Sequence, residues 1–435
     1  MNILVEFGSR ALNNVGDVAM LQVAVGRLRS LWPDAAIRVL SSAPESLARH
    51  CPGTSSVPVN GRRKWLEMSY LPGRFHVPRA MGRRLAATNR AFREHFPGLS
   101  DRLAVERTRS RPEDLADLTA FLDVANNADL LVLSGGGYLT DAFASHAWAC
   151  LDTLNRLQRR GVMTAMVGQG IGPLRDPGLL AFARETFPRV ELIALREGRA
   201  AVPLLESIGF PRDRIRVTGD DAIELAYESR PDRLGTFLGA NVRVSGYSNV
   251  GGDHLRNLRS AIEKAAAGVG AGLLPVPISR AAADSDVEAF RDLLPEGAPD
   301  ATVDGIASPF DVIRRVGRCR VVVTGSYHAG VFALSQGIPV VGLSRSDYYT
   351  DKFMGLADQF GIGCRLVSVD APMMSDSLAA HVRELWGEAE SLRPELLAAA
   401  ERQVREGYEA YELLGERIGR AASLPKAAAR LEVPR

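Results

Sequence analysis

Short runs of consecutive apolar residues alternate along the chain with longer stretches in which apolar residues recur at helical spacing. In the first half, the runs that predict strands are residues 3–5, 36–40, 129–133, 162–167, 192–195 and 215–217. Amphipathic spacing predicts a helix that Pro33 ends, and further helices over 143–159 and 198–208. Uninterrupted apolar runs are typical of strands that helices cover on both faces. The pattern therefore predicts parallel sheets built from βαβ units.

The second half repeats this pattern after a polar segment, 228–236, which contains Pro231 and Gly235 and is interpreted as a linker. The predicted strands there are 241–246, 271–278, 319–324 and 339–343, and the predicted helices are 254–267, 308–318 and 328–336. We therefore expect an α/β protein with two Rossmann-like domains, residues 1–228 and 237–384. Residues 385–422 predict one or two C-terminal helices, and 423–435 a disordered tail.

Residues 60–111 depart from the α/β pattern, with thirteen Lys and Arg against four Asp and Glu. The basic and aromatic residues considered are Arg62, Arg63, Lys64, Arg83, Arg84, Arg90, Arg93, Trp65, Tyr70, Phe75 and Phe92. This composition predicts one or two basic helices inserted into the first domain. Two interpretations stay open: a surface for an anionic acceptor or membrane leaflet, or an ordinary solvated basic face.

Length and composition set the remaining bounds. The 435 residues suit two domains, and 46% hydrophobic with 24% charged residues is ordinary globular composition. A net charge of +2 gives no reason to expect nucleic acid as a partner. The four cysteines are far apart and form no CxxC pair, so neither a zinc site nor a disulfide framework is expected, and no other metal site.

The N-terminal sequence has no secretory pattern, and no apolar stretch reaches the roughly 18 residues that cross a bilayer. We therefore expect a cytoplasmic protein. Peripheral contact with the inner membrane surface stays open.

Three glycine-rich loops follow predicted strands of the first half: residues 8–17, 134–137 and 168–172. Ligands of open α/β sheets bind at the carboxyl ends of the strands, where strand order reverses. Glycines there let the backbone approach a ligand, and helix N-termini offer N–H groups to anions. A single such loop is more often only a turn. Three together favour an anion-binding cleft.

Two features of the second half suggest chemistry. His328 follows a predicted strand in Gly-Ser-Tyr-His-Ala, and imidazole, with an unperturbed pKa near 6.5, suits proton transfer. The alternative is a helix-starting histidine that bonds the backbone. Residues 344–353 carry Arg345 and Lys352 and predict a lid over an anionic ligand, or else a plain polar loop.

Together these motifs resemble the polysaccharide pyruvyl transferase family. The matching segments are NNVGDVA at 13–19, SGGGYLTD at 134–141, GQGIGPL at 168–174, LRE at 195–197, TGDDA at 218–222, SYHA at 326–329 with the GIPVVGL that follows, and the Tyr349/Asp351-Lys352 segment. Their order and spacing hold across roughly residues 2–365. No single motif is decisive, but the set is fairly specific.

The resemblance implies a fold like the GT-B glycosyltransferases, with two Rossmann-like domains facing a cleft and C-terminal helices packing back on the first. It implies transfer of a pyruvyl group from phosphoenolpyruvate to a sugar diol of a cell-surface polysaccharide or its lipid-linked precursor, giving a pyruvate ketal and phosphate. Phosphoenolpyruvate would be the donor substrate, with no separate cofactor. The acceptor partner would be a glycan or lipid-linked sugar.

The resemblance also implies roles for residues. His328 matches the family's histidine and is the candidate acid, with Asp17 and Asp220 as further catalytic candidates. The candidate substrate-binding residues are Asn14, Gly16, Gly135, Gly136, Gly137, Asp141, Gln169, Gly170, Gly172, Arg196, Ser326, Tyr327, Arg345 and Lys352.

This chain departs from the family pattern at two positions. Ser326 stands where family members commonly have an arginine expected to hold an anionic group of the donor, and Glu197 replaces an aspartate. Serine is neutral and too short for a bidentate clamp, so Arg196, Arg345 or Lys352 would have to substitute, or the donor differs.

Two other functions stay open. A glycosyltransferase or other nucleotide-sugar enzyme of the same architecture would use the cleft for a nucleotide diphosphate, but an obvious nucleotide-sugar signature is missing. A non-catalytic sugar-binding protein would explain Ser326 as lost chemistry. Retention of His328 and the glycine loops argues against that second alternative.

Overall fold

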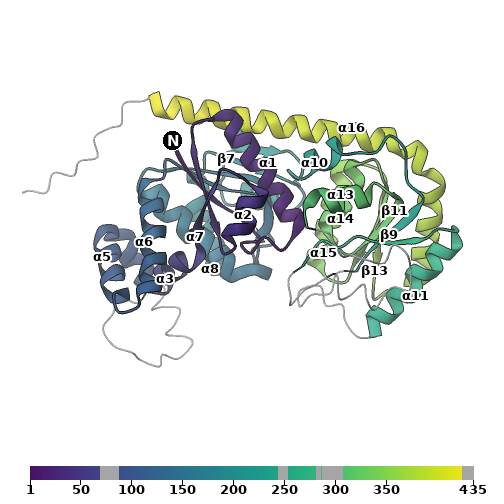
Figure 1. Cartoon of the computed structure of the whole chain (residues 1–435), viewed down its shortest axis with the longest axis horizontal. Helices are drawn as coiled ribbons and strands as arrows, with labels where there is room; N and C mark the ends of the chain where they lie inside the picture. Colours follow the sequence, from purple (N-terminus) through teal and green to yellow (C-terminus); the bar gives the residue numbers. More distant parts are fainter. Residues whose placement is uncertain (69–87, 243–252, 281–285, 287–306, 424–435) are drawn as a thin grey trace, which may run out of the picture.

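The computed structural model describes residues 1–68, 88–242, 253–280, 286 and 307–423. Within these residues the chain forms two parallel sheets, each flanked by helices, which lie side by side and share one long C-terminal helix (Figure 1). This arrangement confirms the α/β class predicted from the apolar runs.

The first sheet has eight strands in the order β3-β2-β1-β4-β6-β7-β8, with β5 paired to β6. Their bounds are β1 Asn2–Glu6, β2 Ala36–Ser41, β3 Ser55–Pro58, β4 Leu130–Leu133, β5 Gly136–Leu139, β6 Met163–Ile171, β7 Leu192–Leu195 and β8 Ile215–Val217. All the pairings are parallel. Strand order reverses between β1 and β4, so the loops that follow these two strands lie at the switch point of the sheet.

Two of the predicted glycine loops are partly strand. β6 continues through Gln169 to Ile171, and β5 forms within the SGGGYLTD segment. The two strands pair Gly136 with Gln169 and Leu139 with Ile171, so the glycines let two short backbones lie together at the sheet edge. The prediction of open loops was wrong at these positions.

Helices cover both faces of this sheet. Their bounds are α1 Val15–Leu31, α2 Pro44–His50, α3 Val59–Glu67, α5 Pro97–Thr108, α6 Pro112–Asn127, α7 Ala144–Arg159, α8 Pro177–Thr186, α9 Ala201–Ser207 and α10 Ile223–Glu228. The α1 helix begins at Asn14, whose side chain accepts the N–H groups of Gly16 and Asp17, and ends just before Pro33 as predicted.

The described parts of the 60–111 segment, which include α3 and α5, pack at the end of the molecule away from the second sheet (Figure 1). Arg62 is buried against Glu6, Arg93 pairs with Asp152 at 2.6 Å, and Trp65 is a core residue. These side chains are structural, so the interpretation of a basic binding surface was wrong for them. Arg83, Arg84, Tyr70 and Phe75 lie outside the described residues.

The second sheet has the order β10-β9-β11-β12-β13. Its bounds are β9 Phe237–Asn241, β10 Leu273–Pro275, β11 Cys319–Thr324, β12 Val340–Ser344 and β13 Cys364–Ser368. The strand predicted at 241–246 overlaps β9 only at Asn241, because β9 already pairs with β11 from Phe237. Residues 243–246 lie outside the described residues. The predicted linker, 228–236, lies between the end of α10 at Glu228 and the start of β9 at Phe237. β13 was missed because this edge strand is only half-buried and lacks an apolar run.

The helices described in this half are α11 Asp253–Gly268, α13 Pro309–Val316, α14 Tyr327–Ser335 and α15 Asp347–Phe360. The lid or polar loop predicted at 344–353 is instead mostly the start of α15. Its first turn forms because the backbone carbonyl of Ser346 accepts the N–H groups of Tyr349 and Thr350, while Tyr349 and Phe353 are buried.

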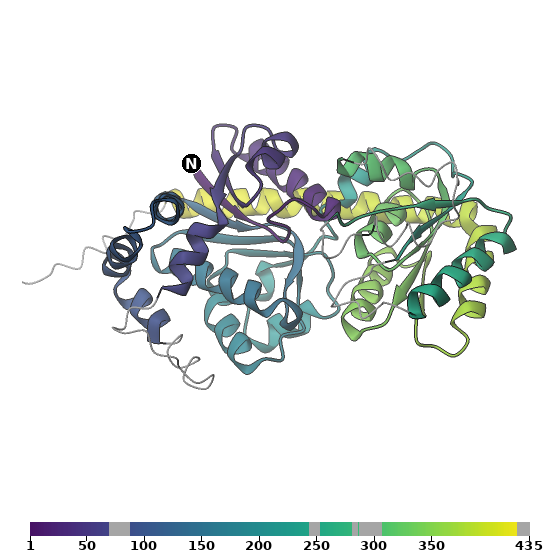
Figure 2. The ribbon, with the colours of Figure 1, turned by 60° about the horizontal axis from the view of Figure 1, so that its bottom comes forward.

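One helix, α16, runs from Met374 to Ser423 along both halves (Figure 1, Figure 2). Val382 packs in the core of the second sheet, whereas Ala410 and Leu414 pack in the core of the first. The expectation that C-terminal helices pack back on the first domain is thereby confirmed, although the helix starts earlier than residue 385. Among the described residues no helix, α16 included, is apolar enough over a sufficient length to cross a membrane.

A buried ion-pair network fixes α16 to the first half. Arg27 of α1 contacts Asp221 at 3.0 Å and Glu224 at 2.6 Å, and the Tyr411 hydroxyl of α16 donates to Asp221 at 3.3 Å. Arg27 and Asp221 are both almost fully buried. Breaking one partner of such a network leaves an uncompensated buried charge.

We expect Arg27→Met to lower the free energy of unfolding by about 3–5 kcal/mol, because the Asp221 carboxylate loses its partner inside the protein. Arg405→Met is the matched control, since Arg405 and Glu409 form an exposed pair on α16 whose loss costs less than about 1 kcal/mol. Urea unfolding of both variants checks this. Equal losses in the two variants would contradict the structural role of Arg27.

Candidate active site

The N-terminus of α1 reaches from the first half to the second. The Val15 N–H donates to the Ile278 carbonyl at 3.0 Å, and Asn14 forms a β-bridge with Ser279. Gly16 lies directly against the His328 ring: a Cβ at this position would come within 2.0 Å of the imidazole Cγ. Glycine is therefore required at Gly16 for the helix to approach His328.

His328 lies in the first turn of α14 and faces a carboxylate of the other half. Its Nε2 is 3.7 Å from Oδ2 of Asp220, which follows β8. Burial raises the pKa of Asp220 from 3.8 to about 7, with the charges of Asp221 and Asp17 adding to the rise and Arg196 opposing it. A histidine and a carboxyl group whose pKa lies near neutrality thus face each other across the two halves.

Arg196 carries the central positive charge of this region. Its side chain, at the end of β7, is 3% exposed and lies over the Tyr327 ring, with the guanidinium carbon 4.3 Å from the ring centroid. Among the described residues its nearest carboxylate is that of Asp220, at 3.8 Å, beyond hydrogen-bond distance. Nε has no hydrogen-bond partner. A buried cation in this state favours binding of an anion.

A pocket of about 340 Å³, open solvent included, lies beside this guanidinium. Its lining residues are Gly137, Gly170, Gly172, Pro173, Arg196, Glu197, Ala200, Tyr348, Asp351 and Lys352. They come from both halves, so the pocket is part of the cleft between them. Among the described residues, His328 is not part of this lining. It lies 3.7 Å from Asp220, which in turn lies 3.8 Å from Arg196.

Gly137 shows how closely the two halves approach. A Cβ there would come within 2.6 Å of a guanidinium nitrogen of Arg196 and 3.2 Å of the Lys352 Cε. The Tyr348 hydroxyl donates to the Gly137 carbonyl at 3.0 Å, and the Lys352 ammonium lies 4.0 Å from the Tyr348 ring centroid. A glycine here admits two cationic side chains to one pocket.

Several other residues predicted from the sequence lie at this site. Asp17 is close enough to raise the pKa of Asp220. Tyr327 supports Arg196 with its ring. Ser326 is the N-cap of α14, but its side chain makes no capping hydrogen bond. The structure thus brings these residues together with Asp220, Arg196 and His328.

Other predicted residues have structural positions. Asp141 accepts the N–H groups of Arg175 and Asp176, and Gln169 donates to backbone carbonyls and to Tyr138. Arg345 pairs with Asp370 at 3.0 Å. None of the three predicted residues is in the pocket lining of the described structure.

Two predicted glycines serve packing. A Cβ at Gly135 would meet the Met20 sulfur at 2.4 Å, and one at Gly136 would meet the Tyr138 ring at 2.6 Å. The adjacent Gly137 is the glycine of this run that lines the pocket.

Tyr348, Glu197 and Asp351 also line the pocket, although the sequence analysis assigns them no role at the site. In the sequence Glu197 stands out only as a replacement for an aspartate, and Asp351 only within a matching segment. Both adjoin a predicted cation, Arg196 or Lys352. That adjacency was the signal that could have identified them.

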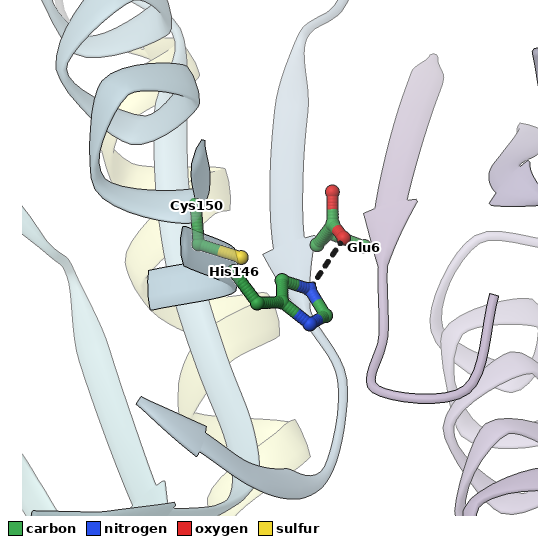
Figure 3. Close-up of side chains that lie close together, drawn as sticks. All are labelled: Glu6, His146 and Cys150. Carbon is green, nitrogen blue, oxygen red and sulfur yellow. Dashed lines mark hydrogen bonds and ion pairs between the residues drawn. The ribbon is translucent and has the colours of Figure 1, made fainter. Parts of the chain in front are cut away.

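Glu6, His146 and Cys150 form the one group in the described structure with three potential metal-ligand atoms within 4.8 Å of one another (Figure 3). Glu6 also pairs with Arg62 and with Arg10, at 3.1 Å for the latter. Although burial opposes it, these positive charges and His146 lower the Glu6 pKa to about 2, while burial raises that of the Cys150 thiol. Two guanidinium groups and a neutral thiol favour an ion-pair network here over a bound cation.

The sequence model of the polysaccharide pyruvyl transferase family matches residues 14–347. This span contains the cleft residues from Asn14 to His328. A search of curated protein sequences gives no significant match.

Several solved structures are similar over almost their whole length. One is Staphylococcus aureus MnaA with UDP, at 13% identity and a TM-score of 0.55, covering 98% of this chain and 97% of that one. Another is the UDP-GlcNAc 2-epimerase of Neisseria meningitidis bound to UDP-GlcNAc, at 13% identity and a TM-score of 0.51, covering 97% of this chain and 100% of that one. A third is a UDP-bound transferase from Siraitia grosvenorii, at 12% identity and a TM-score of 0.52, covering 96% of this chain and 100% of that one. These likenesses show a GT-B-like fold.

We expect Gly16→Ala to displace the His328 ring and abolish turnover, because its Cβ would overlap the imidazole. Gly26→Ala in the same helix is the control: nothing lies within 4 Å of a Cβ there, so activity should persist and stability should rise by up to about 1 kcal/mol. Turnover assays and thermal unfolding of both variants check this. Full activity of Gly16→Ala would show that His328 is not held by α1.

Asp220→Asn tests the raised pKa. Because the folded-state pKa, about 7, exceeds the ordinary 3.8, the folded protein keeps this proton after the unfolded chain has lost it. Wild-type stability therefore falls as pH rises between these values, and the asparagine variant lacks that loss. Relative to wild type, the variant should gain stability as the pH rises from about 4 to about 7, measured by urea unfolding. A difference independent of pH would contradict the raised pKa.

Proposed function

The chain belongs to the polysaccharide pyruvyl transferase family, and on that premise we propose that its donor is phosphoenolpyruvate and its product a pyruvate ketal. The acceptor in this proposal is a sugar of a cell-surface polysaccharide or of its lipid-linked precursor. No cofactor besides the donor is needed for this chemistry.

The observation that carries the donor assignment is the buried Arg196 guanidinium beside the pocket. Phosphoenolpyruvate presents a phosphate and a carboxylate, which a guanidinium binds through two parallel N–H donors. Lys352 lines the same pocket and adds a second positive charge. The donor would thus supply an anionic partner at hydrogen-bond distance, where Arg196 has no carboxylate.

Ser326 is compatible with this donor in the proposal. Its side chain leaves the start of α14 uncapped, and the first N–H groups of a helix have no intrahelical acceptor. Such a terminus attracts anions without an arginine side chain. Arg196 and Lys352, rather than Arg345, supply the compensating charge in this proposal, because Arg345 is paired with Asp370.

The reaction needs one proton on carbon and one on the leaving phosphate. Protonation of the enol methylene makes a methyl group and leaves an electron-poor carbon, to which the first sugar hydroxyl adds. Phosphate then departs with the C–O bond electrons, and the second hydroxyl closes the ketal. The two hydroxyl protons balance those taken up by the methyl group and the phosphate.

His328 is the proposed acid for the methylene. In this proposal an ionised Asp220 stabilises the imidazolium, and burial holds the Asp220 pKa at about 7. The 3.7 Å between His328 and Asp220 is longer than a hydrogen bond. Such catalytic contacts often shorten only in the substrate complex.

The test separates donor binding from turnover in two variants. Arg196→Met should lose the stabilisation by phosphoenolpyruvate seen in thermal unfolding. His328→Gln should keep that stabilisation, while phosphate release in the presence of acceptor falls by about 100-fold or more. Arg345→Met is the control and should keep both properties, since its cation pairs with Asp370 outside the pocket lining.

Retained phosphoenolpyruvate binding in Arg196→Met would refute the donor site. Undiminished phosphate release in His328→Gln would remove this histidine from the reaction.

A further inference from the structure

Two carboxylates line the pocket from opposite halves of the molecule. Glu197 follows β7 of the first sheet, directly after Arg196, and Asp351 lies near the start of α15 in the second half. Neither is needed for the binding of an anionic donor. Two negative charges in a pocket built around cations therefore require another explanation.

The Glu197 side chain is held in place. It is 7% exposed, and its Oε2 accepts the Ala200 N–H at 3.2 Å. On the other side, Gly355 of α15 packs so closely that a Cβ there would lie 3.0 Å from the Glu197 Cβ and Cγ. The carboxylate is thus oriented at the junction of the two halves before any ligand binds.

Asp351 is differently placed. Among the described residues its carboxylate makes no hydrogen bond and no ion pair. Its charge is nevertheless felt by Glu197, whose pKa is raised by burial and, to a smaller extent, by Asp351, against the opposing hydrogen bonds and Arg196. The pair is mutually repulsive, and hydrogen-bond donors from a ligand would relieve that repulsion.

The neighbouring charges decide the class of ligand. Arg196 and Lys352 line the same pocket and oppose a divalent cation between the carboxylates. Neutral hydroxyl groups meet no such opposition, and a carboxylate can accept hydrogen bonds at both oxygens. The pocket therefore suits a ligand pair in which one member is anionic and the other presents hydroxyls.

We propose that Glu197 and Asp351 together bind the two hydroxyl groups of the acceptor sugar, so that the diol is gripped from both halves of the cleft. This inference rests on the function proposed above. It makes both residues determinants of acceptor specificity, since a sugar that lacks one hydroxyl leaves one carboxylate without a donor.

The experiment compares Glu197→Gln and Asp351→Asn with wild type in phosphate release from phosphoenolpyruvate. The acceptor probes are methyl hexopyranosides with free diols. Each variant should raise the KM for the glycoside by about tenfold or more, the loss expected for a hydrogen bond to a charged group. The KM for phosphoenolpyruvate should change less than about twofold, because the donor cations remain in place.

Asp358→Asn is the matched control. Asp358 lies on α15, as Asp351 does, and its carboxylate pairs with Arg199 of the first half at 3.1 Å. Asp358 is not in the pocket lining. Its loss should leave both KM values unchanged. A merely structural role for carboxylates at this junction would instead affect all three variants alike.

The possible results distinguish a failure of this inference from a failure of the proposed function. No phosphate release by wild type with any glycoside would refute the proposed function, and the inference with it. Release by wild type, with the glycoside KM unchanged in both Glu197→Gln and Asp351→Asn, would overturn the inference alone. An equal rise in both KM values would also overturn it, by showing that the pair shapes the whole pocket.

Discussion

The charge of Arg196, buried where the two halves meet, is the constraint on which the cleft depends. Its guanidinium lies over the Tyr327 ring and has Asp220 only at 3.8 Å. Gly137 and Gly170 have no side chains that would compete for this space. A protein stable only through its own contacts would pair such a cation more closely. In the proposed function an anionic substrate completes the pairing, which would link the stability of the site to its function.

The approach of the two halves rests on packing remote from that charge. The α16 helix contributes to the cores of both sheets, and Arg27 joins it to α1 through Asp221 and Tyr411. The same α1 helix presents Gly16 to His328 at its other end. The helix that this network joins to α16 is thus the same helix that packs against the proposed acid.

The fold was largely predictable because buried parallel strands leave uninterrupted apolar runs. The exceptions have physical causes: the half-buried edge strand β13 lacks such a run, and glycines in β5 and β6 imitate a loop. Arg196 and His328 could be singled out because a charged or titratable side chain follows a buried strand, and the structure places both where the two halves meet. The positions of Arg345 and Gln169 could not be predicted, because their partners, Asp370 and the β4 end, are set by tertiary contacts that one sequence does not reveal.

The most direct test of the central claim is calorimetric titration of the wild-type protein with phosphoenolpyruvate and, separately, with UDP-N-acetylglucosamine. Binding of phosphoenolpyruvate, weakened by added salt and absent in Arg196→Met, with no binding of the nucleotide sugar, is the result we predict. Binding of the nucleotide sugar without phosphoenolpyruvate would contradict it. The GT-B-like cleft would then have to be assigned to nucleotide-sugar chemistry.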